Sequence, residues 1–315
     1  LAEHSNYEEI AYLLLFGKLP AKQELKDFTR KLAEQRQLPK ELVKLMKIYT
    51  KTANSMDALR TSVSLLADYD TNLSDLSVEK NLERGIDLVA KFPTLVTTAY
   101  RIKHDLKLVK PKKNLSSAAN FLCMLLGETP REVAVKALDT DFILHAEHGF
   151  NASTFSARVT ISTLSDMYAA IASAIGTLKG PLHGGAAEEV FIMLKKIGAA
   201  ENVESYAENA LKKKEKIMGF GHRVYKTMDP RAVHLKAMSK KLAEDTRNFQ
   251  YFSISEKLEH VVVPLLKEKR IYPNVDFYSP TVYNNLKIPE ELFDAIFATS
   301  RISGWVAHVI EQLSD

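Results

Sequence analysis

Apolar residues recur at helical spacing along almost the whole chain, and this periodicity limits the fold more than any other feature of the sequence. Local signals agree with it. Ser5 and Glu8 form a capping box before the first apolar run. Gly17 and Gly127 each follow an apolar run, as glycine commonly does at a helix end. Only residues 271–283 have the character of an extended segment, which is far too little for an α/β fold. The sequence therefore predicts an all-α protein.

Composition narrows the class of protein without deciding its function. The 315 residues suffice for one large domain or two smaller ones, and the net charge of +4 requires no nucleic-acid partner. The single cysteine, Cys123, cannot form an internal disulfide, which indicates a reducing compartment and predicts a cytoplasmic location. No apolar run reaches the length of a membrane span. The chain opens at Leu1 with no recognisable signal peptide.

The segment GFGHRVYKTMDPRA, residues 219–232, is the strongest candidate for a functional loop. Two glycines around Phe220 free the backbone, and a histidine and several cations follow within ten residues. These polar residues are His222, Arg223, Lys226 and Arg231. Such a loop suits an anionic substrate. The alternative is an ordinary glycine-rich turn with a solvated basic rim.

Three further polar clusters interrupt the helical background. They are HAEHGFNAS with His145 and His148, GPLHGG with His183, and PNVDFYS with Asp276. Each lies at a predicted helix end or in a loop, where functional groups are usually displayed. Spacing along the sequence does not show whether the clusters come together.

A metal site is one interpretation of the first cluster. His145 and His148, three residues apart, share a helix face with Glu147 beside them. Zinc needs a third protein ligand, and the chain has neither an HExxH motif nor a cysteine cluster. A buried histidine next to a helix-capping one explains the pair better, and we predict no metal.

Acid–base chemistry on an anionic carbonyl compound is the other interpretation. Asp276 supplies a base, and the histidines supply hydrogen-bond donors. Arg231 and Arg301 each present a planar fork that suits a carboxylate. Arg301 lies in an apolar helix, so it needs an anion, either a carboxylate of the protein or a ligand.

Four motifs, in this order, resemble those of citrate synthase. They are GPLHGGAAEEV, MGFGHRVYKTMDPRA, YPNVDFYSP and FATSRISGWVAH, and the likeness extends over essentially the whole chain. The branch resembled is that of archaea and many bacteria, which includes 2-methylcitrate synthases. The resemblance implies an all-α dimer whose small domain closes over the active site. The large domain would comprise residues 1–183 and 287–315, and the small domain residues 184–286.

The resemblance also implies roles for individual residues. Asp276 would take a proton from the methyl group of acetyl-CoA, and His183 would hydrogen-bond the thioester oxygen. His222 would bind and protonate the carbonyl of oxaloacetate. The implied oxaloacetate-binding residues are His148, His222, Arg231 and Arg301. The implied CoA-binding residues are Ile217, Met218, Gly219, Phe220, Gly221 and Lys226. No cofactor is implied, because acetyl-CoA is a co-substrate.

The chain is thus expected to be an acyltransferase that condenses acetyl-CoA and oxaloacetate with water to give citrate and CoA. The alternative is a 2-methylcitrate synthase that uses propionyl-CoA, or an enzyme that accepts both. A non-catalytic CoA- or metabolite-sensing scaffold would lack His183, His222 or Asp276, and all three are present. The helix that starts near Ala186 would disfavour a charged His183, so that its neutral ring donates to the enolate.

The expected assembly is a homodimer whose helices at 115–126 and 153–178 supply the interface. Members of the family have about thirty more residues at the front. They also have a C-terminal tail, which contributes an arginine to the partner subunit's site. This chain ends at Asp315. Either the tail is disordered or absent from the structure, which we expect, or the set of carboxylate-binding residues is incomplete.

Overall fold

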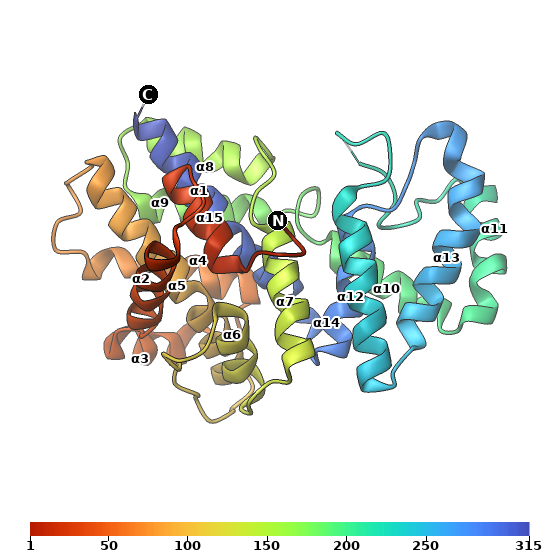
Figure 1. Cartoon of the computed structure of the whole chain (residues 1–315), viewed down its shortest axis with the longest axis horizontal. Helices are drawn as coiled ribbons and strands as arrows, with labels where there is room; N and C mark the ends of the chain where they lie inside the picture. The colour runs from red at the N-terminus through yellow and green to blue at the C-terminus, as the bar shows by residue number, and fades with distance from the viewer. Residues whose placement is uncertain (223, 315) are drawn as a thin grey trace. The chain divides into compact units, whose positions relative to one another are not determined.

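The computed structural model describes residues 1–222 and 224–314, and these residues form an all-α fold (Figure 1). Fifteen α-helices occur within the described ranges, whereas extended pairing there is limited to one isolated bridge. Arg223, one of the cations predicted for the functional loop, lies outside the described residues. The all-α prediction is confirmed.

The chain forms two compact units, which we call unit 1 and unit 2. Unit 1 comprises residues 1–131, 142–184 and 294–315, and unit 2 comprises residues 132–141 and 185–293. The helices of unit 1 are α1 (Tyr7–Phe16), α2 (Lys22–Gln35), α3 (Lys40–Tyr49), α4 (Ser55–Leu66), α5 (Val78–Lys103), α6 (Ser117–Leu126), α8 (Ala152–Ser162), α9 (Met167–Leu178) and most of α15 (Phe293–Ser314). Those of unit 2 are α10 (Ala186–Ile197), α11 (Val203–Lys212), α12 (Pro230–Thr246), α13 (Gln250–Leu266) and α14 (Ser279–Asn285). The division between the units falls within α7 (Glu132–His145).

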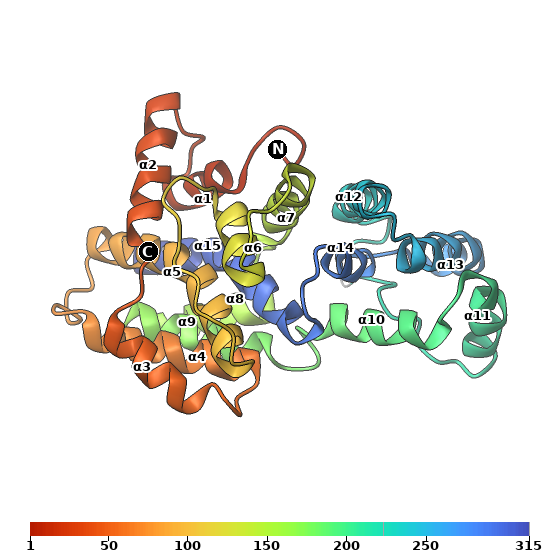
Figure 2. The ribbon, with the colours of Figure 1, turned by 90° about the horizontal axis from the view of Figure 1, so that it is seen from below.

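Unit 1 is built around α5, its longest helix. This helix of 26 residues packs against α2, α3, α4, α6 and α9 (Figure 2). Its buried residues surround the helix rather than follow one stripe, which is typical of a helix at the centre of a large core. The helix α15 is also mostly buried and includes the fully buried Trp305.

Unit 2 is a smaller bundle. In it α12 packs on α14, α11 on α13, and α10 on α14 (Figures 1 and 2). The helix α12 begins at Pro230, with Asp229 as its N-cap, which is a common start because proline has no N–H to leave unpaired.

Two details of the first half of the chain differ from the sequence prediction. The first capping box uses Asn6 and Glu9 rather than Ser5 and Glu8, because Asn6 takes the extended backbone conformation that a cap requires. The single helix predicted over 153–178 is two helices, α8 and α9. Between them Leu164 has a φ of +61°, and Asp166 caps α9 by accepting a hydrogen bond from the Ala169 N–H.

The prediction of an extended segment over 271–283 is wrong for most of its length. Pairing is limited to the bridge between Phe220 and Pro273. Residues Val275–Phe277 form a 3₁₀ turn, because the Asn274 side chain accepts a hydrogen bond from the Asp276 N–H at 3.0 Å. The helix α14 follows at once. Asp276 therefore lies in a capped turn.

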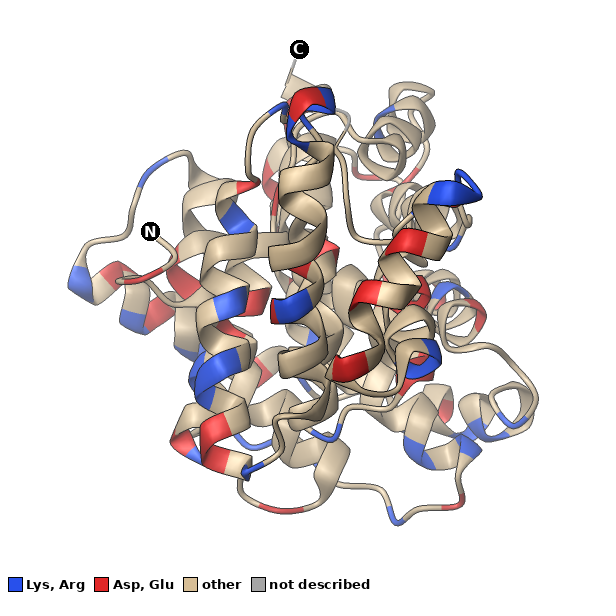
Figure 3. Cartoon of the chain, turned by 90° about the vertical axis from the view of Figure 1, so that its right-hand side faces the viewer, with Lys and Arg blue, Asp and Glu red and all other residues tan. Residues whose placement is uncertain are grey.

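Figure 3 shows acidic and basic residues interspersed along the helices seen from that side, in line with the small net charge. Within the described part of the chain, no helix is long and apolar enough to cross a membrane.

Candidate active site

The predicted site residues fall into two groups, one on each unit. In unit 1, the ring of His183 is held by Ser153, the second residue of α8. The Nε2 atom of His183 accepts a hydrogen bond from the Ser153 N–H at 3.2 Å and lies 2.8 Å from the Ser153 Oγ. The indole N–H of Trp305 donates to the same Oγ at 3.1 Å, and the Ser153 hydroxyl donates to the Oδ1 of Asn151 at 2.8 Å. Since Nε2 is an acceptor, the proton of the neutral ring is on Nδ1.

The charge state of His183 follows from its surroundings. Burial, together with the positive charge of Arg301, lowers the pKa of His183 to about 4. A neutral His183 was predicted from the nearby start of α10, whereas burial has the larger effect on its pKa. His183 is therefore a neutral donor through Nδ1 at physiological pH.

Arg301 is 1% exposed, and its binding partners include main-chain and aromatic groups. Its Nε donates to the carbonyl oxygen of His145 at 2.6 Å, and its guanidinium lies 4.7 Å from the centre of the Phe297 ring. The ring of His145 packs edge-on against Phe297 at 5.1 Å. His145 is thus a buried structural residue, while His148 lies in the turn between α7 and α8.

In unit 2, two distant stretches of backbone pair and bring His222 and Asp276 into one loop cluster. The Gly221 N–H donates to the Tyr272 carbonyl at 2.8 Å, and the Asn274 N–H donates to the Gly219 carbonyl at 2.9 Å. The Asn274 side chain also donates to the Gly221 carbonyl at 2.9 Å. His222 and Asp276 are 54 residues apart along the chain, so the sequence alone did not predict that they lie close together.

The glycine-rich start of this loop needs its first glycine. Gly219 has a φ of +79°, and a β-carbon there would lie 2.8 Å from the Phe277 ring and 2.9 Å from Val190. The backbone at Gly219 therefore lies in close contact with Phe277 and Val190. The ammonium group of Lys226 is near the His222 carbonyl, at 3.4 Å.

The orientation of His222 is set by the backbone of its own loop. Its Nδ1 accepts from the N–H groups of Val224 and Tyr225, each at 3.0 Å, so its proton is on Nε2. This Nε2 lies 3.4 Å from the Nη2 of Arg231. Burial and the charge of Arg231 together lower the pKa of His222. Two donors therefore face each other, an arrangement that an oxygen atom of a ligand would relieve.

Arg231 differs from the sequence expectation in one respect. Its fork already holds a carboxylate of the protein, because Nε donates to Asp229 Oδ1 at 3.0 Å and Nη2 donates to Oδ2 at 2.7 Å. Burial alone would raise the pKa of Asp229, but its bonds with Arg231 bring the pKa below the usual range. Asp229 was not predicted as a partner of Arg231, although an aspartate directly before a proline at a helix start is typical of an N-cap.

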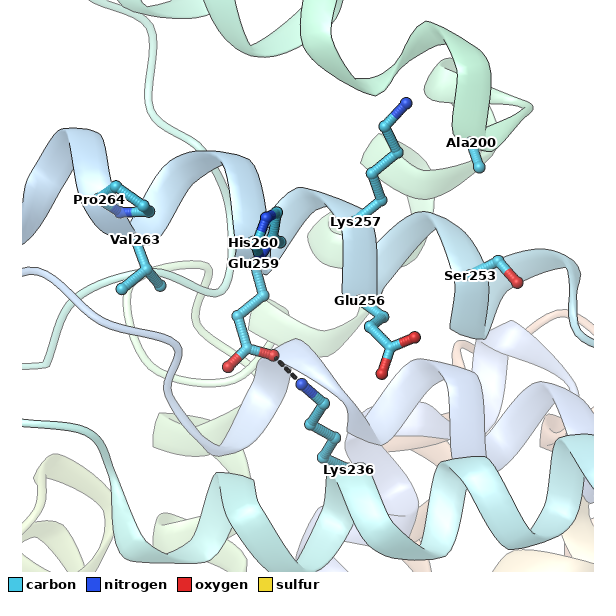
Figure 4. Close-up of a pocket in the computed structure, with 9 residues that line it drawn as sticks. All are labelled: Ala200, Lys236, Ser253, Glu256, Lys257, Glu259, His260, Val263 and Pro264. Carbon is cyan, nitrogen blue, oxygen red and sulfur yellow. Dashed lines mark hydrogen bonds and ion pairs between the residues drawn. The ribbon is translucent and has the colours of Figure 1, made fainter.

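Unit 2 also has a cavity that the predicted site residues do not line (Figure 4). It has a volume of about 730 Å³, and α13 supplies most of its lining, with Lys236 from α12 and Ala200 as the other lining residues. An ion pair between Lys236 and Glu259, at 2.8 Å, crosses it, and His260 lies on the same wall. None of the site residues predicted from the sequence lines it. Within residues 1–222 and 224–314, no group of three or more His, Cys, Asp or Glu side chains is placed to hold a metal ion.

Comparison with known proteins decides the family. Residues 1–315 match the family model described as citrate synthase, C-terminal domain. The chain belongs to the citrate synthase family. It is 48% identical over 313 residues to citrate synthase 2 of Bacillus subtilis, covering 99% of this chain and 83% of that one. It is 40% identical over 313 residues to the citrate/2-methylcitrate synthase of the same organism, with the same coverage.

Solved structures of citrate synthases agree with the fold. The enzyme from Pyrobaculum aerophilum has a TM-score of 0.95 at 40% identity, covering 100% of this chain and 81% of its own. The Thermoplasma acidophilum enzyme, in a ternary complex with carboxymethyl coenzyme A and oxaloacetate, has a TM-score of 0.92 at 32% identity, with coverages of 98% and 82%. The family, the fold and the enzyme class predicted from the sequence are confirmed.

Proposed function

We propose that the chain condenses acetyl-CoA with oxaloacetate and water to give citrate and CoA, with His183, His222 and Asp276 as its catalytic residues. The observation that carries the proposal is the complementary state of the two histidines. Each is held neutral and in a single tautomer, His183 with its proton on Nδ1 and His222 with its proton on Nε2. Two neutral donors suit a reaction in which negative charge develops on two carbonyl oxygens.

The proposed first step removes a proton from the methyl group of acetyl-CoA. Asp276 takes this proton, while the Nδ1–H of His183 donates to the thioester oxygen as the enol forms. A carboxylate is a weak base for a C–H bond. One well-placed donor on the developing charge is worth on the order of 3 kcal/mol, which lowers the barrier to this step.

The second step forms the carbon–carbon bond. The enol carbon attacks the carbonyl carbon of oxaloacetate, and His222 gives its Nε2 proton to the carbonyl oxygen. Water then hydrolyses the thioester of citryl-CoA and releases CoA and citrate. The proposed oxaloacetate-binding residues are His148, His222, Arg231 and Arg301. Since Asp229 occupies the fork of Arg231, we expect a substrate carboxylate to meet its Nη1.

For CoA, we propose the backbone of Ile217–Gly221 and the side chain of Lys226. The close packing of Gly219 against Phe277 fixes the path of this backbone, which suits recognition through main-chain groups. Neither a cofactor nor a metal enters the proposed steps, and their absence stays a prediction, as does the cytoplasmic location.

We further propose that unit 1 and unit 2 are the large and small domains of the family, and that domain closure brings the two groups of site residues together. The domain boundaries at 183/184 and 286/287 stay a prediction. Closure would also exclude water until the enol has reacted.

A 2-methylcitrate synthase remains the second candidate, because one relative at 40% identity carries both names. An added methylene changes the free energy of binding by only about 1–3 kcal/mol. We expect kcat/KM with oxaloacetate to be at least about tenfold higher for acetyl-CoA than for propionyl-CoA. Equal or inverted values would favour the second candidate, and no CoA release with either thioester would refute the proposed function.

We also propose a homodimer to which the partner subunit contributes a C-terminal arginine. The helix α8 supports it, since its exposed residues include Phe155 at 59% and Val159 at 48%, one turn apart, and Leu164 follows at 70%. Sedimentation at micromolar concentration should give twice the mass of the chain. A stable, fully active monomer would contradict this.

A further inference from the structure

The turn that carries His148 is fastened to α15 through one carboxylate. The Oε1 atom of Glu147 accepts a hydrogen bond from the Gly149 N–H, which closes the turn around His148. The same Oε1 lies 3.1 Å from the Nε2 of His308, on α15. Both side chains are largely buried, with exposed fractions of 26% for Glu147 and 14% for His308. One oxygen atom therefore joins the turn to the helix.

His308 keeps its donor toward Glu147 in either charge state. Its Nδ1 faces Arg158 Nη1 at 3.3 Å and Glu311 Oε2 at 3.4 Å. In the neutral ring Nδ1 accepts from Arg158, and in the charged ring it donates to Glu311. Both states leave a proton on Nε2. The guanidinium of Arg158 also lies 4.8 Å from the centre of the Phe150 ring, and this ring packs edge-on against His308 at 5.4 Å.

Backbone packing brings the same turn directly onto α15. A β-carbon on Gly304 would overlap with the Ala146 carbonyl oxygen and with the Glu147 carboxylate. Arg301, Gly304 and His308 follow one another at helical spacing, so they share a face of α15. Along this face Arg301 binds the His145 carbonyl, Gly304 admits the turn, and His308 holds Glu147.

The charge of Glu147 is consistent with this arrangement. Burial alone would raise the pKa of Glu147, but its hydrogen bond and electrostatic interaction with His308, together with the positive charge of Arg301, bring this pKa below the usual range. Glu147 is therefore a carboxylate at neutral pH, and it is close enough to Arg301 for the two charges to interact.

We propose that Glu147 and His308 are positioning residues for oxaloacetate binding. They hold the 146–149 turn on α15, so that His148 on the turn and Arg301 on the helix keep the spacing that a dicarboxylate requires. This inference rests on the proposed function of the same site. It assigns no contact between Glu147 or His308 and the substrate.

The sole tryptophan gives a readout that does not depend on activity. Trp305 lies on α15 and is hydrogen-bonded to Ser153, the residue that holds His183. Titration of the full chain with oxaloacetate, followed by Trp305 fluorescence, therefore yields a Kd before any acetyl-CoA is added.

Glu147→Ala and His308→Ala should each raise this Kd about tenfold, as expected for the loss of a charge-assisted hydrogen bond. Glu147→Gln and His308→Gln should recover most of the affinity, because a glutamine oxygen still accepts from Gly149 and a glutamine amide still donates to Glu147. Kinetics should show the split expected of positioning, with KM for oxaloacetate raised and KM for acetyl-CoA changed less than about twofold.

Glu311→Gln is the matched control, because it removes the outer partner of His308 and leaves Glu147 untouched. Its Kd should stay within about twofold of the wild-type value. An unchanged Kd in both alanine variants would overturn the inference. So would equal losses in the alanine and glutamine variants together with a lowered Tm, which would indicate a purely structural role. If the wild-type chain does not bind oxaloacetate, the proposed function itself fails.

Discussion

Asp276→Asn is expected to lower kcat by a factor of about 10³ while the affinity for oxaloacetate stays near normal. The asparagine keeps the shape of the side chain and removes the base, and loss of a general base costs about 10²–10⁴ in rate. The backbone should not move, because Asn274 holds the residue 276 N–H at 3.0 Å and is itself bonded to Gly219 and Gly221. The substitution thus tests the base alone.

Exchange of the acetyl methyl protons with deuterated solvent measures the step directly. An unreactive analogue of oxaloacetate would hold the enzyme in the closed state, so that exchange reports proton removal without condensation. Wild type should exchange, and Asp276→Asn should not. Asp276→Glu is the control for placement, because it keeps the charge but moves the carboxylate by one methylene, and it should also lose most of kcat. Undiminished exchange in Asp276→Asn would show that another group is the base.

Local sequence signals predicted the helices well, because they act between neighbours along the chain. Gly17 and Gly127 end α1 and α6 in the left-handed conformation, with φ values of +72° and +82°. The secondary-structure prediction was wrong where a hydrogen bond with one side chain decides the local backbone conformation. The turn at Val275–Phe277 depends on the Asn274 side chain, and its β-branched and aromatic neighbours had suggested an extended segment.

The candidate site was predictable in its residues but not in its connections. The motifs pointed to His183, His222 and Asp276, because glycine and histidine in a loop are visible in the sequence. The residues that hold these side chains by hydrogen bonds could not be predicted from the sequence. Ser153 is 30 positions from His183 and 152 from Trp305, and no spacing rule joins them.

The sequence was equally unable to show which charged side chain lies next to the buried Arg301. The sequence left open whether the buried Arg301 meets a protein carboxylate or a ligand. The structure places Glu147 close enough for its charge to interact with Arg301, through a turn 154 residues away. For Arg231 the partner was only two residues away, in Asp229, and the helix-start pattern around Pro230 carried that information.

His183→Ala is expected to lower kcat by about 10²–10³, because it removes the donor that would stabilise the developing enolate. Ser153→Ala is the matched control. It removes the Oγ that bonds His183 and Trp305 but keeps the Ser153 backbone N–H, which alone holds Nε2 as an acceptor at 3.2 Å. The Nδ1–H tautomer should therefore survive, and kcat should fall less than about tenfold.

The pH dependence gives a second check on His183. In the unfolded chain its pKa is ordinary, whereas in the folded chain it is about 4, so the unfolded state binds more protons between these values. The contribution of His183 therefore makes the folded state more stable as pH rises from about 4 to about 6.5. In His183→Ala, Tm should vary less steeply with pH over this window, and the wild-type kcat should show no ionisation of His183 above pH about 5. A fall in wild-type kcat centred near pH 6.5 that disappears in His183→Ala would mean that the ring is charged where we place a neutral donor.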